Sequence, residues 1–236
     1  YLSRHGQSTY NALGKIGGDS GLSAHGDIYA QRLADFVDTK ITKDKDTKKE
    51  VPARLWTSTM RRTKETTKYI KQHAFMRPDE YDPSLTHEWA QMRPRAWHHL
   101  DELFAGQCDG MTYEEIEETL PEEFARRAAD KLAYRYPRGE SYLDVIARLE
   151  PIIIEMERHR EPLLIVGHQG VLRIIYAFYM GKTRAETPYV SIPLHTVTHL
   201  EPSAFACKES KYKLYRIELT SDGQDEPNKA RSASFQ

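Results

Sequence analysis

Apolar residues along this chain follow two spacings, one typical of buried strands and one typical of amphipathic helices. Short apolar or β-prone runs occupy 1–3, 54–57 and 162–166, and a helix-patterned stretch follows each of them. The helical spacing is clearest over 25–38, 59–72, 141–158 and 171–180, and two late runs, 196–200 and 212–219, predict further strands. Strands that alternate with helices indicate a largely parallel α/β sheet.

Three segments lack such a pattern. Lys, Asp and Thr dominate 39–52, which predicts a solvated loop without function. The stretch 75–99 mixes prolines, tryptophans and histidines without periodicity, so we expect a long irregular loop or excursion. The polar end, 221–236, predicts a tail outside the main domain of 1–220, and its residues 231–234 weakly resemble a basic-directed phosphorylation site.

Composition narrows the function classes. The 236 residues fit one compact domain, and 34 Lys and Arg against 35 Asp and Glu leave no basic footprint for nucleic acid. No apolar run approaches the ~20 residues that cross a bilayer, so we expect no membrane association. Two cysteines, Cys108 and Cys207, cannot build a disulfide framework, and no secretory signal is visible, which predicts a cytoplasmic protein. Only three residues precede Arg4, so we expect the natural chain to begin further upstream.

Candidate chemistry gathers where the predicted strands end. Arg4 and His5 follow the first run, Arg61 and Arg62 follow the second, and His168 follows the third. In open α/β sheets, ligands bind beyond the carboxyl ends of the strands. Two imidazoles and several guanidiniums at that edge suit a phosphoryl group, because the charge on its oxygens needs fixed positive donors. Such a site requires neither a metal nor a cofactor.

Two motifs carry a resemblance to a known family. Residues 2–8, Leu-Ser-Arg-His-Gly-Gln-Ser, together with Gly167-His168-Gln169, resemble the histidine phosphatase superfamily, which includes phosphoglycerate mutases. Further stretches resemble the bisphosphatase domain of the bifunctional phosphofructokinase-2/fructose-2,6-bisphosphatase family. They are Asn11, 16–23, 56–58, 62–63, 111–116, 121–125, 134–137, 139–142 and 193–197.

The resemblance implies a three-layer α/β/α fold with a mostly parallel, phosphoglycerate mutase-like sheet and a helical lid insertion over about 103–142. It implies hydrolysis of the 2-phosphate of fructose 2,6-bisphosphate to fructose 6-phosphate and phosphate. A kinase domain is expected upstream, because these residues contain no nucleotide-binding P-loop. A homodimer is compatible with the resemblance.

The resemblance also assigns catalytic roles. His5 would be the nucleophile, Arg4, Arg62 and a protonated His168 would clamp the phosphoryl group, and Glu102 would be the proton donor. A neutral imidazole can attack phosphorus in line and so divides one hard hydrolysis into two transfers. Glu102 must be partly buried to hold its proton, whereas a surface carboxylate is the plainer alternative. The family usually has an aspartate where this chain has Phe104, and often an asparagine where it has Asp101, which puts the surroundings of the acid in question.

Substrate-binding residues are implied in the same way. Asn11 and Gly17 match positions that hold the 2-phosphate, although a plain turn is the alternative. The sugar and its 6-phosphate would meet six residues, namely Tyr113, Arg127, Lys131, Tyr142, Gln169 and Arg173. The competing interpretation is that Glu122–Arg126 and Glu123–Arg127 are surface pairs at helical spacing.

Other functions stay open at this point. A phosphoglycerate mutase or a broad-specificity phosphomonoesterase would share the histidine core, and turnover of 3-phosphoglycerate would favour it. A regulatory module that binds the sugar bisphosphate without efficient turnover would form no acid-labile phosphoenzyme.

Overall fold

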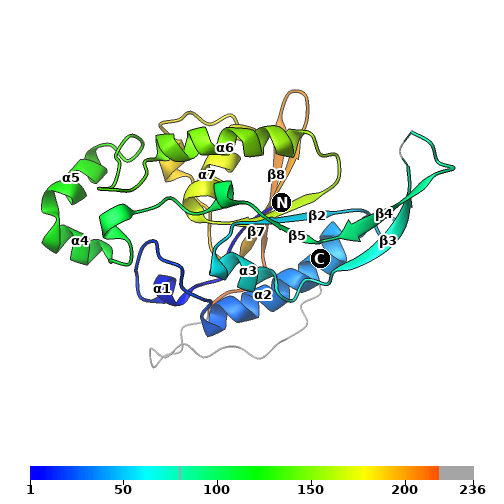
Figure 1. The fold of residues 1–236 in the computed structure, drawn as a ribbon, viewed down its shortest axis with the longest axis horizontal. Coiled ribbons are helices and arrows are strands. Elements are labelled where there is room, and N and C mark those ends of the chain that lie inside the picture. The colour runs from blue at the N-terminus through cyan, green and yellow to red at the C-terminus, as the bar shows by residue number, and fades with distance from the viewer. Residues whose placement is uncertain (80, 218–236) are drawn as a thin grey trace.

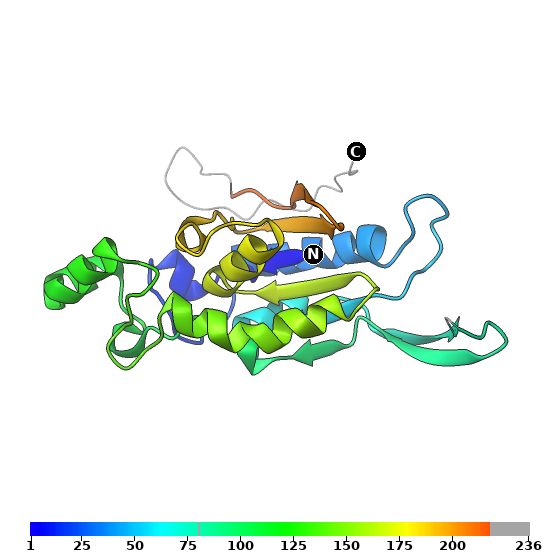
Figure 2. The same cartoon turned by 90° about the horizontal axis from the view of Figure 1, so that it is seen from above.

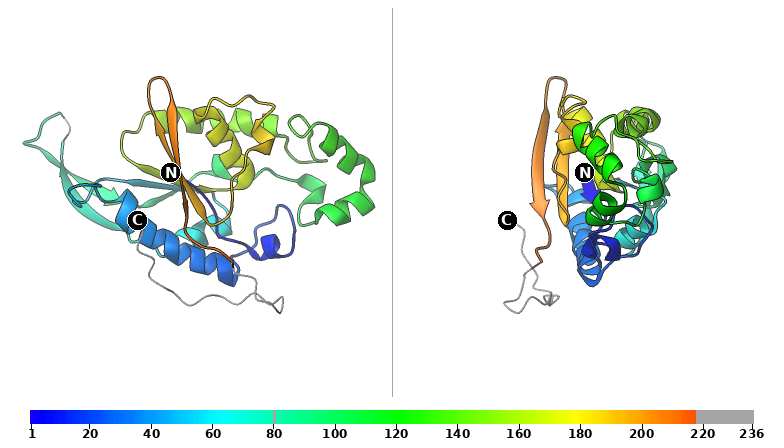
Figure 3. Two further views of the ribbon diagram at one scale, coloured as in Figure 1. Left: turned by 180° about the vertical axis from the view of Figure 1, so that it is seen from behind. Right: turned by 90° about the vertical axis from the view of Figure 1, so that its left-hand side faces the viewer.

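The computed structural model describes residues 1–79 and 81–217 (Figure 1). Six strands form the central sheet in the order β5-β2-β6-β1-β7-β8. They are β1 (Leu2–Arg4), β2 (Arg54–Thr57), β5 (Pro94–Ala96), β6 (Leu163–Gly167), β7 (Thr196–Pro202) and β8 (Cys207–Lys213). The first four strands of that order run parallel, whereas β7 is antiparallel to both β1 and β8. The expected largely parallel sheet is therefore confirmed, with an antiparallel hairpin at one edge (Figure 3).

Helices cover both faces of the sheet, which gives the predicted three layers (Figure 2). On one face α2 (Ala24–Phe36) packs its Leu33 and Phe36 in one core with Leu164 and Val166 of β6. On the other face α6 (Tyr142–Glu157) and α7 (Gln169–Tyr179) share a core with Ile165. Alternate residues of β6 thus enter opposite cores, as the pleat of a strand requires.

The helices begin at residues that can cap them. Ser8, Thr112 and Ser141 each form a capping box with the residue three positions later, at the start of α1 (Thr9–Ala12), α4 (Tyr113–Thr119) and α6. The helix predicted over 59–72 is much shorter, since α3 spans only Arg61–Thr67. Its threonine hydroxyls bond back to the carbonyls of the preceding turn, and such β-branched, back-bonding residues favour helix interiors poorly.

Two strand predictions need correction. Among the described residues the last strand is β8, which begins five residues before the predicted run 212–219 and ends at Lys213. Most of its residues are polar, which hides the strand pattern. The excursion over 75–99 is not irregular. β3 (His73–Pro78) and β4 (Thr86–Gln91) pair as a projecting hairpin, and β5 then returns to the central sheet beside β2.

Aromatic and ionic contacts anchor the base of this hairpin. The guanidinium groups of Arg54 and Arg77 both lie over the Trp89 ring, with their central carbons 4.5 Å and 4.7 Å from its centroid. Glu161 accepts from both arginines, at 3.3 Å and 2.8 Å. The segment 39–52 is a solvated loop only in part. A π-helix (Val37–Ile41) extends α2 and buries Ile41, which corrects the prediction there, whereas 43–50 are mostly exposed as predicted. The predicted tail and its phosphorylation motif lie outside the described residues.

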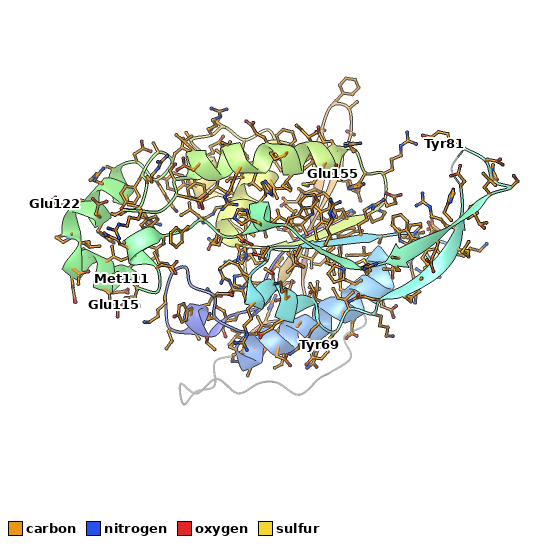
Figure 4. The ribbon with its side chains drawn as sticks, viewed as in Figure 1. Tyr69, Tyr81, Met111, Glu115, Glu122 and Glu155 are labelled. Carbon is orange, nitrogen blue, oxygen red and sulfur yellow. The ribbon has the colours of Figure 1, made fainter. Side chains whose placement is uncertain are left out.

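The predicted lid stands at the opposite end of the molecule from the hairpin. Its helices are α4 and α5 (Pro121–Ala129), and Figure 4 places Met111, Glu115 and Glu122 at this end and Tyr81 near the hairpin tip. The lid has a small core of its own, formed by Ala105, Cys108, Ile116, Tyr134 and Tyr136. Within residues 1–79 and 81–217, no helix is both long enough and apolar enough to cross a membrane.

Candidate functional site

A polar pocket lies where the carboxyl ends of the strands meet the lid. The residues lining it include every predicted site residue except His168, which lies buried behind His5. The lining residues are Arg4, His5, Ser8, Asn11, Lys15, Ile16, Gly17, Arg62, Glu102, Leu103, Ala105, Tyr113, Arg127, Lys131, Tyr134, Tyr136, Tyr142, Gln169, Gly170 and Arg173. Three elements of the sheet and both ends of the lid therefore converge on one cavity.

His5 follows β1 and is only 3% exposed. Its Nδ1 lies 2.7 Å from the carbonyl oxygen of Gly6, and its Nε2 lies 3.2 Å from Nε of Arg62. A carbonyl oxygen only accepts and a guanidinium only donates, so the proton of His5 sits on Nδ1 and the lone pair on Nε2. Burial, then the charges of Arg62 and Arg4, lowers the pKa of His5 well below its usual value. The imidazole is therefore neutral and nucleophilic.

Of the two arginines beside His5, Arg62 is buried and Arg4 is partly buried. Arg62 lies in the first turn of α3, and its Nη1 donates to the Gly18 carbonyl at 2.6 Å. Nη1 of Arg4 donates to the Ile192 carbonyl at 3.2 Å, while its buried Nε has no hydrogen-bond partner in the described part of the chain. Burial lowers the pKa of Arg4 to about 10, so the group stays charged at neutral pH. A buried charged donor without a partner suits an anionic ligand.

His168 caps α7 from the end of β6, with its ring centroid 5.2 Å from that of His5. Its Nε2 lies 2.7 Å from the Ser58 hydroxyl, which in turn lies 2.8 Å from the hydroxyl of Thr63. Burial, Arg62 and His5 lower the pKa of His168 well below its usual value. The ligand-free site therefore disfavours a protonated His168, first because the ring is buried and then because the nearby arginines add like charge. The expected protonation during phosphoryl transfer stays a prediction.

Glu102 is half-buried and lines the pocket, so the surface-carboxylate alternative is wrong. Its Oε1 accepts from the backbone N–H groups of Leu103 at 3.0 Å and Gly170 at 3.1 Å. A Cβ atom on residue 170 would lie 2.6 Å from that oxygen, so only glycine there leaves room for the carboxylate. Asp101 and Phe104, the two residues that differ from the family's usual ones, lie near Glu102 in the chain. The Asp101 carboxylate accepts from the backbone N–H and the hydroxyl of Thr59, and the N–H of Phe104 donates to Glu140.

Asn11 in α1 and Gly17 in the loop that follows both line the pocket. The side-chain oxygen of Asn11 accepts from the Ser8 N–H at 3.1 Å, which leaves its amide NH₂ for a ligand. Gly17 has φ +65°, and a Cβ atom there would lie 1.8 Å from the Asp109 carboxylate. The Gly18 N–H donates to Asp109 at 2.9 Å, which ties this loop to the lid. Gly17 therefore does more than form a turn, because its missing side chain also leaves room for the Asp109 carboxylate of the lid.

The far end of the pocket is built from the lid and α7. Nη2 of Arg127 donates to the Tyr113 hydroxyl at 2.8 Å, and Nη1 of Arg173 donates to the Tyr142 hydroxyl at 2.9 Å. Burial, then Arg173 and Arg127, lowers the pKa of Lys131 to about 8. The surface-pair alternative pairs Arg126 with Glu122 and Arg127 with Glu123. Arg126 does form a surface pair, but with Glu123 at 2.7 Å, whereas Arg127 donates to Tyr113 instead.

The charge of the pocket is strongly positive. Six cationic side chains line it, Arg4, Lys15, Arg62, Arg127, Lys131 and Arg173, against one carboxylate, Glu102. Sequence reasoning missed Lys15, Ser8, Gly170 and the tyrosines 134 and 136. Lys15 was recognisable, because it lies between Asn11 and Gly17. Among the described residues, no group of three or more His, Cys, Asp or Glu side chains could hold a metal ion.

Comparisons with known proteins agree with this geometry. Residues 1–213 match the family model of the histidine phosphatase superfamily (branch 1). The chain is similar to the 6-phosphofructo-2-kinase/fructose-2,6-bisphosphatase of Arabidopsis thaliana, with 44% identity over 90% of this chain and 25% of that protein. It is also similar to the fructose-2,6-bisphosphatase of Saccharomyces cerevisiae, with 46% identity over 90% of this chain and 41% of the relative. The chain thus spans less than half the length of these relatives.

Solved structures show the same fold. A putative alpha-ribazole-5'-P phosphatase from Escherichia coli superposes with a TM-score of 0.70 at 18% identity, covering 92% of this chain and 97% of that one. A mycobacterial glucosyl-3-phosphoglycerate phosphatase has a TM-score of 0.63 at 22% identity, covering 89% and 95%.

Proposed function

Because this chain belongs to the histidine phosphatase superfamily, we propose that it hydrolyses the 2-phosphate of fructose 2,6-bisphosphate through a phosphohistidine on His5. The observation that carries this proposal is the state of His5, a buried neutral imidazole whose free lone pair lies beside Arg62. The name of the yeast relative supplies the substrate, and the cationic far end of the pocket fits its second phosphate.

In the first step Nε2 of His5 attacks phosphorus. A nitrogen–phosphorus bond forms, the bond from phosphorus to the sugar oxygen breaks, and Glu102 gives its proton to the departing oxygen. Arg4 and Arg62 offset the charge on the phosphoryl oxygens, and His168 lies next to the reacting centre. The negative phosphoryl group favours protonation of His168, which the ligand-free site disfavours.

In the second step water attacks the phosphohistidine. Glu102 takes a proton from that water, and the electron pair of the nitrogen–phosphorus bond returns to Nε2 of His5. The backbone N–H of Gly170 keeps the carboxylate facing the pocket in both steps. Phosphate then leaves, and the starting tautomer of His5 is restored.

The second phosphate gives the substrate its orientation. Asn11 and Gly17 lie near the 2-phosphate end, whereas Tyr113, Arg127 and Lys131 form the lid end that would bind the 6-phosphate. Gln169, Arg173 and Tyr142 also line the pocket and would contact the sugar. Binding energy from the far phosphate then aligns the reacting phosphate.

Two further proposals concern the whole protein, one from the relatives and one from the cysteines of this chain. The Arabidopsis relative is named for both a kinase and a bisphosphatase, and this chain matches a quarter of it. We expect the kinase to be a separate domain of the same full-length chain. Both cysteines, Cys108 and Cys207, are free thiols, which fits a reducing, cytoplasmic setting.

The test is turnover together with trapping of the intermediate. The purified chain should release one phosphate from fructose 2,6-bisphosphate, and acid-labile label should map to His5 and disappear in His5→Ala. Label on another residue would refute the mechanism. Faster turnover of 3-phosphoglycerate would replace the substrate, and binding of the bisphosphate without any phosphoenzyme would make the chain a regulatory module.

A further inference from the structure

His195 is a buried histidine that the proposed mechanism does not use. It precedes β7, is 4% exposed and has φ +58°, the left-handed region that few residues other than glycine adopt. Its ring packs against the rings of Tyr29 and Tyr215, with centroids 5.1 Å and 5.2 Å away. A residue kept in an unfavourable backbone conformation is a candidate for a functional constraint.

The contact that sets His195 apart is with the loop that carries the nucleophile. The backbone N–H of Gln7 donates to Nε2 of His195 at 3.2 Å. Burial, followed by the charged or titratable groups of His25, Arg4 and Lys213 around the ring, lowers the pKa of His195 to about 4. The ring is therefore neutral near pH 7, and Nε2 offers the lone pair that the Gln7 N–H requires.

That N–H belongs to the same peptide unit as the carbonyl that holds His5. The Gly6 oxygen, which accepts from Nδ1 of His5, and the Gln7 nitrogen are the two ends of the Gly6–Gln7 peptide. The peptide is trans, so its carbonyl and N–H point in opposite directions. His195 thus accepts a hydrogen bond from the N–H end of this rigid peptide plane, and His5 donates one to its carbonyl end.

The rest of the loop is fixed to other elements. The N–H of His5 donates to the Gly167 carbonyl at 3.0 Å, and the N–H of Gly6 donates to the hydroxyl of Thr66 at 2.9 Å. These bonds fix the peptides before Gly6 but not the plane that follows it. The orientation of the Gly6 carbonyl therefore depends on the bond to His195.

We propose that His195 is a positioning residue for the nucleophile: by accepting the Gln7 N–H, it orients the Gly6–Gln7 peptide so that the Gly6 carbonyl keeps the proton of His5 on Nδ1. The tautomer of a histidine is set by the hydrogen bond that its other nitrogen makes. A peptide polarised at its N–H end is also a better acceptor at its carbonyl end. This inference rests on the proposed role of His5 as nucleophile.

Two substitutions of His195 separate positioning from folding. His195→Gln places an amide oxygen near the position of Nε2, but glutamine tolerates the left-handed conformation poorly. His195→Asn tolerates that conformation, but its shorter side chain does not reach the Gln7 N–H. A purely structural role predicts that asparagine is the better replacement, whereas a positioning role predicts glutamine. Tyr215→Phe keeps the ring packing and serves as the matched control for the cluster.

Two measurements decide between them. In ¹⁵N spectra of the ligand-free protein, His5 should carry its proton on Nδ1 in wild type and His195→Gln. In His195→Asn it should populate the Nε2–H form in part, since the Arg62 donor still favours the proton on Nδ1. In His195→Asn, kcat should fall about three- to tenfold, which corresponds to the loss of one ordinary hydrogen bond, and KM should not change. The factor should be the same for fructose 2,6-bisphosphate and for p-nitrophenyl phosphate. His195→Gln and Tyr215→Phe should stay within about twofold of wild type.

An unchanged His5 tautomer and an unchanged kcat in folded His195→Asn would overturn the proposal, and so would a His195→Gln protein impaired as much as His195→Asn. The spectra need no substrate. If wild type fails to hydrolyse fructose 2,6-bisphosphate, the proposed function is lost, but the tautomer measurement still tests the role of His195.

Discussion

Nε of Arg62 donates a hydrogen bond to Nε2 of His5 across 3.2 Å. The arginine therefore occupies the lone pair with which His5 would attack phosphorus in the proposed mechanism. An incoming phosphoryl group offers Arg62 negatively charged oxygens, which are stronger acceptors than a neutral imidazole. Binding of the substrate can thus transfer Arg62 from the nucleophile to the phosphoryl group and free the lone pair when it is needed.

Arg62→Lys should lower kcat by roughly ten- to a hundredfold, because a hydrogen bond to a charged group contributes about 1.5 to 3 kcal/mol. Lysine keeps the charge but loses the fork that reaches both His5 and the Gly18 carbonyl. The rate of phosphoenzyme formation in a rapid-quench experiment measures this step. A near-native rate would mean that charge alone is required.

Arg127→Ala should raise KM for fructose 2,6-bisphosphate roughly ten- to a hundredfold, because a charge-assisted phosphate contact is lost. A small substrate without a second phosphate should be barely affected. Arg126→Ala is the matched control, since this neighbour pairs with Glu123 on the surface. Equal losses on both substrates would place Arg127 in folding or in the phosphoryl-transfer centre.

The affinity for the 6-phosphate should fall as the pH rises through about 8. The pKa of Lys131 is lowered to about 8, chiefly by burial, so the free protein loses this positive charge above that pH. We expect kcat/KM for the bisphosphate to decline there, since this ratio reports the groups of the free enzyme. Lys131→Arg should remove the decline, because arginine stays charged. A small monophosphate that showed the same decline would contradict this assignment.

Hydrolysis should survive EDTA. The cationic side chains of the pocket supply the positive charge that the transferring phosphoryl group needs. Steady-state rates before and after dialysis against the chelator measure this directly. Activity that disappears and returns with one added divalent ion would refute the expectation.

Gly26→Ala should destabilise the protein although alanine favours helices. Gly26 lies in the first turn of α2, and a Cβ atom there would come within 2.1 Å of the Gln7 carbonyl oxygen. Overpacking of this kind costs about 1 to 3 kcal/mol, so thermal unfolding should shift down by several degrees. Gly14→Ala has open space and should lose less, from its φ of +70° alone. Equal shifts would mean that the loop yields to the extra carbon.

The sequence by itself determined the strands that carry the site and the residues at their ends. β2 spans the predicted 54–57, and His5 and His168 lie with Arg62 where the apolar runs end. Buried parallel strands are continuous apolar runs, and their carboxyl ends must share one edge, so local pattern was enough. The excursion over 75–99 was different, because most residues of β3 and β4 are exposed and show neither an apolar run nor a regular alternation. These strands pair with each other rather than with the central sheet.

Only the tertiary structure decided the chemical state of the site. The neutral form of His168 follows first from its burial and then from Arg62 and other charges of distant elements. The position of the Glu102 carboxylate depends on the missing side chain of Gly170. The bond from the Gln7 N–H joins residues 188 positions apart. Protonation and orientation depend on distances between residues far apart in the chain, and those distances exist only once the sheet has brought its strand ends together.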